Sequence, residues 1–283
     1  MSIGIVLALV AAVGYGTADF VGGLTARRAS PWAVALAGQL AGGLAMLAAG
    51  LTLPGQAARP ADFAWALMAG VGSAVGTVFL YRGLARGRMG VVAPVSGVGA
   101  ALVPVFVGVS LGERLGTLTW IGVLVALPGI YFVSREVADG TDRSWGGIAD
   151  GALAGLGFGL LFVALAQVPE SAGVLPLAAN QGVGAVLTVT VAGLLRQPWV
   201  PRDRAGRRAV GWGGVGGVLG TAGTAAFLLA SHSADLAVVG VLASLYPAVT
   251  VLLAATVLRE PFRPSQGLGL LVCGASVGLV AVG

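Results

Sequence analysis

The sequence predicts an all-α integral membrane protein with ten transmembrane helices, arranged as two inverted five-helix repeats. Three observations lead to this prediction: an apolar composition, a series of apolar runs of spanning length, and a repeat within the chain. Hydrophobic residues make up 57% of the 283 residues and charged residues only 10%, and the mean hydropathy is +0.95. A soluble domain carries roughly 25% charged residues. This chain therefore has too few polar side chains to cover a surface in water.

Apolar runs separated by short connectors extend along the whole chain. The hydrocarbon core of a bilayer is ~30 Å thick and needs about 20 helical residues to cross it. All six tryptophans lie near the ends of these runs, and indole side chains prefer the membrane–water interface. The predicted helices are 2–25, 31–53, 63–83, 90–111, 117–134, 146–168, 172–195, 209–230, 236–258 and 265–282.

The second half of the chain repeats the first at offsets of 142 to 147 residues. Five helices are an odd number, so the second copy must enter the membrane from the opposite face. We therefore predict inverted repeats over residues 1–138 and 139–283, with a substrate site between them near the membrane midplane. The aligned residues are Gly14-Tyr15-Gly16 with Gly157-Phe158-Gly159, Gln39 with Gln181, Trp65 with Trp212, Gly76-Thr77 with Gly223-Thr224, Glu113 with Glu260, and Gly122 with Gly269.

A helix of small residues that leads into a glutamate and then into the last helix of the repeat occurs in both halves. The segments read FLYRGLARGRMGVVAPVSGVGAALVPVFVGVSLGERL at 79–115 and VVGVLASLYPAVTVLLAATVLREPF at 238–262. In the second copy Pro247 precedes Glu260 by 13 residues, whereas Ala100 fills the proline position in the first copy. On these segments the sequence resembles the EamA-type branch of the drug/metabolite transporter superfamily over its whole length. The resemblance implies ten helices in two repeats and transport of small polar or amphipathic solutes without nucleotide hydrolysis.

Asp19, within the first predicted helix, is the strongest candidate for a functional residue. An ionisable side chain inside a membrane is costly, so it suggests a functional site. A carboxylate there could bind a proton and a cationic substrate alternately. The alternative is that Asp19 lies near the interface and faces water or the Arg27-Arg28 pair.

Polar residues that recur in both halves form a second group of candidates. Gln39 with Gln181 and Thr77 with Thr224 would either line a pseudo-symmetric cavity or form ordinary interhelical hydrogen bonds. Arg82 would either bind a substrate carboxylate or anchor the helix end at the interface. The remaining substrate or coupling candidates are Tyr15, Tyr81, Tyr246, Ser96, Ser244 and Asn180.

Three residues are predicted to act at helix ends. Glu113 and Glu260 each lie beside arginine and would form structural ion pairs, or gate contacts made in one conformational state. Pro247 would break its helix and free a backbone carbonyl for a cavity.

The composition excludes several classes of function. The chain has one His, one Cys and no Lys, so it lacks both a P-loop and the side chains for a metal cluster or a nucleophile–base pair. We expect no enzymatic activity, no cofactor and no metal. The predicted function is secondary transport of a small metabolite, such as an amino acid or an amphipathic drug-like solute, with export favoured and proton coupling as one option. The alternatives are a structural or accessory membrane subunit and a channel.

All 16 basic residues are arginine, and all but Arg59 and Arg114 lie on one side of the predicted membrane. The positive-inside rule assigns that side to the cytoplasm. We therefore predict a multi-pass protein of the bacterial cytoplasmic (inner) membrane with both termini outside. The expected partners are the lipid bilayer and a small-molecule substrate, without nucleic acid, and the chain would be a monomer or homodimer.

Overall fold

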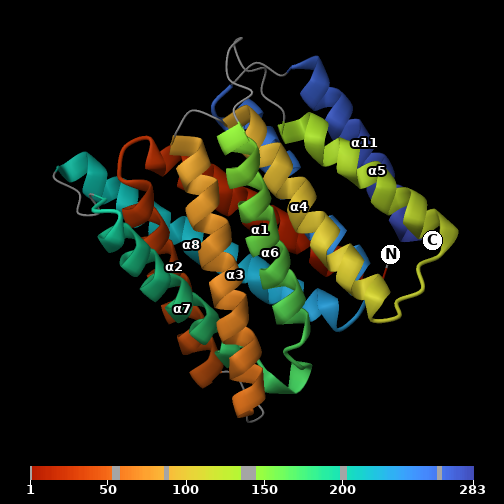
Figure 1. Ribbon diagram of the computed structural model, residues 1–283, viewed down its shortest axis with the longest axis horizontal. Helices are drawn as coiled ribbons and strands as arrows, with labels where there is room; N and C mark the ends of the chain where they lie inside the picture. The colour runs from red at the N-terminus through yellow and green to blue at the C-terminus, as the bar shows by residue number, and fades with distance from the viewer. Residues whose placement is uncertain (1, 53–57, 86–88, 135–144, 198–202, 260–262) are drawn as a thin grey trace.

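The computed structural model describes residues 2–52, 58–85, 89–134, 145–197, 203–259 and 263–283, and this part of the chain is helical without β-strands (Figure 1). Eight segments are long and apolar enough to cross a membrane, and Val95–Ser110 and Thr117–Val133 are shorter apolar helices. The helices are α1 (Ile3–Ala26), α2 (Pro31–Thr52), α3 (Pro60–Ala85), α4 (Met89–Ser110), α5 (Thr117–Ser134), α6 (Trp145–Ala166), the 3₁₀ helix η1 (Glu170–Ala172), α7 (Leu175–Leu194), α8 (Arg204–Ser231), α9 (Leu236–Ala243), α10 (Tyr246–Val257) and α11 (Pro264–Val282).

Most helix ends lie within a few residues of the predicted ones, but α8 begins at Arg204 and not at residue 209. The side chain of Asp203 caps this helix, since its Oδ1 accepts a hydrogen bond of 2.8 Å from the backbone N–H of Gly206. Aspartate is among the preferred N-cap residues. The arginines of the first turn made this helical segment resemble a polar connector.

The predicted helix 236–258 forms one candidate membrane span, Leu236–Val257, and it is interrupted between α9 and α10, next to Pro247, which was predicted to break it. Pro247 has no N–H to donate to the residue four positions earlier, and its ring crowds that carbonyl. Ala100 holds the matching position in α4, which continues unbroken past it. The two copies therefore differ in their prolines, since the second has Pro247 at the break, whereas the first has Pro94 and Pro104 on either side of Ala100 and continues as one helix.

The helices of the two halves interleave in a symmetric pattern. The main contacts are those of α1 with α8 and α3 with α6, of α2 with α8 and α3 with α7, and of α4 with α6 and α1 with α9 and α10. In addition α2 packs on α7, α4 on α9, and α5 on α11. The repeat matches α1 with α6, α2 with α7, α3 with α8, α4 with α9 and α10, and α5 with α11. When each helix is replaced by its mate, every contact named above becomes another of these contacts. The packing therefore follows the internal repeat of the sequence.

Matched glycines occupy the tightest crossings. A Cβ atom on Gly14 of α1 would lie 2.8 Å from the Cα of Gly223 on α8. At the matching crossing, a Cβ atom on Gly157 of α6 would overlap the backbone of Gly76 on α3. Small residues allow membrane helices to approach this closely, so part of the glycine content is explained by the contact between the halves.

Large apolar side chains are exposed around the outside of the molecule. Phe106 on α4, Leu194 at the end of α7 and Leu271 on α11 are 75%, 78% and 74% exposed. By contrast, every residue of α9 is buried. An apolar surface of this kind suits lipid contact and is unusual for a protein in water.

Gly217→Ala is expected to lower the free energy of unfolding by about 1–3 kcal/mol, because the added methyl overlaps the backbone of Gly38 where α8 crosses α2. Thermal melting of the purified protein in detergent measures this loss. The control is Gly211→Ala on the same helix, where no atom lies within 4 Å of the new methyl. Equal melting temperatures for the two variants would contradict the tight crossing.

Candidate functional site

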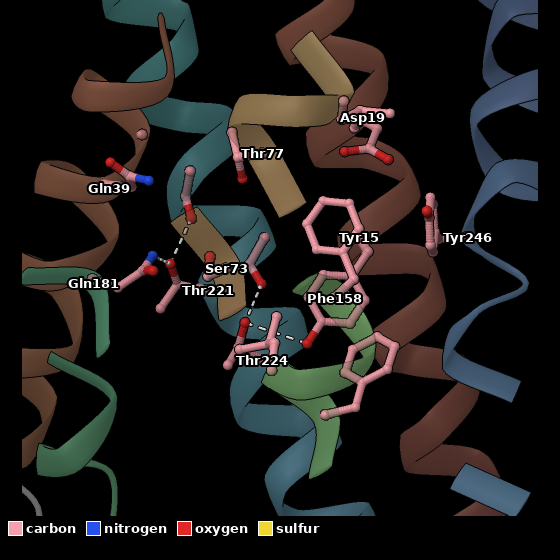
Figure 2. A pocket seen from close by; sticks show the side chains of 16 residues that line it. Tyr15, Asp19, Gln39, Ser73, Thr77, Phe158, Gln181, Thr221, Thr224 and Tyr246 are labelled. Atoms are coloured by element: carbon pink, nitrogen blue, oxygen red, sulfur yellow. Dashed lines mark hydrogen bonds between the residues drawn. The ribbon is translucent and has the colours of Figure 1, made fainter. Parts of the chain in front are cut away.

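A cavity of about 150 Å³ lies between the two halves, and helices α1, α2 and α3 of the first half and α6, α7, α8 and α10 of the second half contribute to its wall (Figure 2). Small residues at positions 38, 217 and 220 form part of the wall and leave room for it. The structure brings together these predicted site residues around the cavity: Tyr15, Asp19, Gln39, Thr77, Gln181, Thr224 and Tyr246.

Other predicted site residues lie elsewhere. Ser96 on α4, Ser244 at the α9–α10 break and Asn180 on α7 are buried, but they do not line this cavity. Pro247 lies at the break, where it follows the cavity residue Tyr246. Tyr81 and Arg82 belong to the last turn of α3, but their side chains are outside the described part of the structure, and so is the whole of Glu260.

Asp19 lies at one end of the cavity, one helical turn beyond Tyr15 and above both Tyr15 and Tyr246 in Figure 2. Its side chain is partly buried. Asp19 is the only carboxylate among the described residues of the lining. Asp19 therefore provides the cavity with a carboxylate.

Hydroxyl groups of α8 are held by hydrogen bonds on the wall of the cavity. The phenol of Tyr15 donates to Oγ1 of Thr224 at 3.3 Å, and Thr224 donates to the carbonyl of Gly220 at 3.1 Å. The amide nitrogen of Gln181 donates to Oγ1 of Thr221. These side chains therefore already have hydrogen-bond partners within the protein.

Gln39 is different, because both the nitrogen and the oxygen of its side-chain amide lack a hydrogen-bond partner in the described part of the chain. The side chain is only 7% exposed. A buried polar group left without a partner costs about 1–3 kcal/mol, and such groups in folded proteins call for an explanation. Gln39 is therefore a polar point of the cavity wall that receives no hydrogen bond from the described part of the protein.

Aromatic rings form part of the cavity wall. Phe162 stacks on Phe227 with ring centroids 4.5 Å apart, and its centroid lies 5.8 Å from that of Tyr15. Phe158 also lines the wall. The cavity is therefore amphipathic, since Asp19 and Gln39, which lie on opposite sides of it in Figure 2, are polar and phenylalanines form another part of its wall.

Among the polar and aromatic residues of the wall, the sequence analysis did not select Ser73, Thr221, Phe158 and Phe162. Helical spacing could have identified the first two, since Ser73 lies one turn before Thr77 and Thr221 lies one turn before Thr224. The two phenylalanines are aligned with Tyr15 and Asp19 in the repeat, a signal that a search for polar residues ignores.

Glu113 departs from the predicted ion pair with a neighbouring arginine. Its two carboxylate oxygens accept hydrogen bonds of 2.6 Å and 3.0 Å from the backbone N–H groups of Leu236 and Ala237. Glu113 thus caps α9, and a negative charge is favourable at a helix N-terminus. Because α9 belongs to the second half, this carboxylate joins the two halves.

The cap lies at the end of the molecule that also holds both chain termini (Figure 1). Between this end and the cavity, the helices are packed with fully buried apolar side chains, among them Leu165, Val168 and Leu177. The cavity is therefore closed toward the termini.

Removing the Glu113 carboxylate is expected to lower the free energy of unfolding by about 1–3 kcal/mol, because two buried N–H groups lose their acceptors. Thermal melting of Glu113→Ala in detergent measures the effect. Glu170→Ala, which removes an exposed carboxylate in η1, is the matched control. A Glu113→Ala protein as stable as the control would show that the cap is dispensable.

The described residues contain no group of three or more His, Cys, Asp or Glu side chains placed to hold a metal ion.

Comparisons with known proteins are consistent with this arrangement. Residues 2–135 and 145–282 each match the model of the EamA-like transporter family. One solved structure, described only as the crystal structure of a protein, is 19% identical and has a TM-score of 0.76, and the match covers 99% of this chain and 96% of that one. At this identity the likeness concerns the fold alone. None of the curated proteins compared matches the chain.

Proposed function

The chain belongs to the EamA-like transporter family, and on this premise we propose that it is a secondary transporter that carries a small metabolite across a membrane by alternating access. In this proposal the eight long apolar segments and the two shorter ones provide ten crossings, with α9 and α10 counted together as one. The two five-helix halves then have opposite orientations in the bilayer.

The cavity between the halves is the observation that carries the proposal. Matched residues of the two repeats both line it, for example Gln39 with Gln181 and Thr77 with Thr224. Transporters with inverted repeats bind their substrates at this interface near the membrane midplane. A structural subunit has no need of a polar cavity built from both halves.

In the proposal this conformation opens toward the side opposite the chain termini. Glu113 and the buried apolar side chains close the end with the termini. Asp19 lies farther along α1 than Tyr15 and is therefore nearer to Arg27, at the other end of this helix. If the arginine-rich end is cytoplasmic, this conformation loads solute from the cytoplasm. That direction corresponds to export.

Asp19 is the proposed coupling residue. A carboxylate in a cavity within the membrane can hold either a proton or a cation, but not both at once. Release of the solute on the far side would then allow a proton to bind and to return with the protein to the inward-facing state.

Asp19→Asn is expected to abolish transport driven by a proton gradient while leaving the fold intact, since asparagine keeps the shape but cannot carry the proton. Mass-spectrometric profiles of the medium from cells that produce the wild type, the variant or neither should show export only with the wild type. Asp203→Asn is the control, because asparagine also caps a helix well and Asp203 lies at the exposed start of α8.

Identical profiles for all cells would contradict transport. Export that persists in Asp19→Asn and ignores an imposed pH gradient in proteoliposomes would contradict coupling through Asp19, and flux that fails to saturate would favour a channel.

The arginine distribution further supports a bacterial inner-membrane protein with both termini outside. A reporter that is active only in the cytoplasm, fused after Gly283, is expected to stay inactive, whereas the same reporter inserted in the 198–202 connector should be active. The reverse pattern would invert the topology.

A further inference from the structure

The two halves line the cavity with different chemistry at matched positions. The repeat aligns Asp19 with Phe162 and Tyr15 with Phe158, and all four residues lie on the cavity wall. In both pairs the first half provides the polar member and the second half provides phenylalanine. The helix packing is symmetric, but the chemistry of the cavity is not.

The two matched glutamines occupy equivalent places but differ in their partners. Each lies across a glycine of the opposite helix: a Cβ on Gly42 would meet the Gln181 amide nitrogen at 2.7 Å, and a Cβ on Gly184 would meet that of Gln39 at 3.0 Å. Gln181 donates to Thr221. The repeat mate of Thr221 is Ala74, which has no hydroxyl group. The partner that satisfies Gln181 is therefore missing for Gln39.

The same difference recurs at a second hydrogen bond. Tyr15 donates to Thr224 across the interface between the halves. The matching pair is Phe158 with Thr77, and phenylalanine cannot donate to the threonine hydroxyl. Both differences between the repeats therefore leave a polar side chain of the first half, Gln39 or Thr77, without the hydrogen bond that its mate in the second half makes.

From this asymmetry we infer that the cavity binds a small organic ammonium ion that also carries a hydroxyl group, held in one orientation. The ammonium group pairs with Asp19, the hydroxyl group bonds to the amide of Gln39, and the apolar body lies against Phe158 and Phe162. The inference rests on the proposed transport function and specifies its substrate class.

Three features of the site support this class. A carboxylate with tyrosine rings beside it favours an ammonium group through charge and cation–π attraction. An amide with both its donor and its acceptor unused fits a hydroxyl group, which can accept and donate. A cavity of about 150 Å³ admits a molecule about the size of benzene with short substituents.

A matched set of ligands tests the inference. Tyramine has both the ammonium and the hydroxyl group, phenethylamine lacks the hydroxyl group, 4-ethylphenol lacks the ammonium group, and tyrosine adds a carboxylate. Calorimetric titration of the purified protein in nanodiscs is expected to give tyramine the highest affinity. The loss of the hydroxyl group should weaken binding about five- to tenfold, as expected for one neutral hydrogen bond, and the loss of the ammonium group should weaken it more, because a charged partner of Asp19 is removed.

Variants assign each ligand group to its residue. Gln39→Ala should lower the affinity for tyramine to that for phenethylamine and leave phenethylamine itself unchanged. Asp19→Asn should remove the preference for tyramine over 4-ethylphenol. Gln181→Ala, which removes an amide already bound to Thr221, should leave the ratio of tyramine to phenethylamine affinity unchanged.

Restoring the missing partner is the sharpest test. Ala74→Thr places a hydroxyl group at the repeat mate of Thr221, and a hydrogen bond from Gln39 to this group should remove the advantage of tyramine over phenethylamine. Ala74→Val, of nearly the same shape but without the hydroxyl, should keep that advantage. If neither variant folds at this buried position, the Gln39→Ala ratio decides the question.

An equal loss of tyramine and phenethylamine in Gln39→Ala, or tighter binding of tyrosine than of tyramine, would overturn the inference. Selective tyramine binding without flux into proteoliposomes would contradict the proposed transport function and leave the substrate class standing. Flux of zwitterions or anions without tyramine binding would contradict the substrate class and leave the proposed transport function standing.

Discussion

The close approach of backbones at helix crossings between the halves is the constraint on which the rest of the structure depends. Gly14 with Gly223 and Gly157 with Gly76 bring α1 against α8 and α6 against α3, and at this separation there is no room for a side chain. Such contacts supply dispersion attraction where lipid removes the hydrophobic drive for helices to associate. They also fix where the remaining side chains of the same helices point, and those of Asp19, Thr77 and Thr224 face the cavity as a result.

Symmetric helix packing does not require a symmetric cavity wall, because the residues at the helix crossings are not the residues that determine the polarity of the wall. The glycines at the crossings recur in both halves, whereas Asp19 and Phe162 differ completely in polarity at matched positions. A duplicated module can therefore keep its fold while one copy becomes polar and the other apolar. For a transporter this is useful, since a solute bound in one orientation can contact a carboxylate with one end and aromatic rings with the other.

Much of the fold follows from the sequence, since apolar run length and the offset repeat are one-dimensional signals. Asp19, Gln39 and Gln181 were also identifiable, because a polar side chain within an apolar helix stands out. Other features depend on packing that no single segment reveals. Phe158 and Phe162 line the cavity only because α6 faces α3 and α1, and apolar residues do not stand out in an apolar helix. The lack of a partner for Gln39 required knowing that Ala74 replaces a threonine at the matched position. The bond from Glu113 to α9 joins residues more than 120 positions apart, so adjacency to Arg114 was a poor guide to it.

The two irregular features of α9 connect closure of one end with the cavity itself. The helix begins at the carboxylate of Glu113, beside the closed end, and it ends at the break before Pro247, where Tyr246 borders the cavity. All eight of its residues are buried, so α9 cannot shift without disturbing its neighbours α4 and α1. Protein interiors are close-packed and tend to switch between discrete arrangements and not to deform continuously. In the proposed cycle, α9 is therefore the element best placed to link the presence of a solute to the opening of the closed end. It is short and rigid, it is capped by a residue of the first half, and it ends at the break beside the binding cavity. The matching helix α4 has no such break, so the two halves would move differently even though they pack alike.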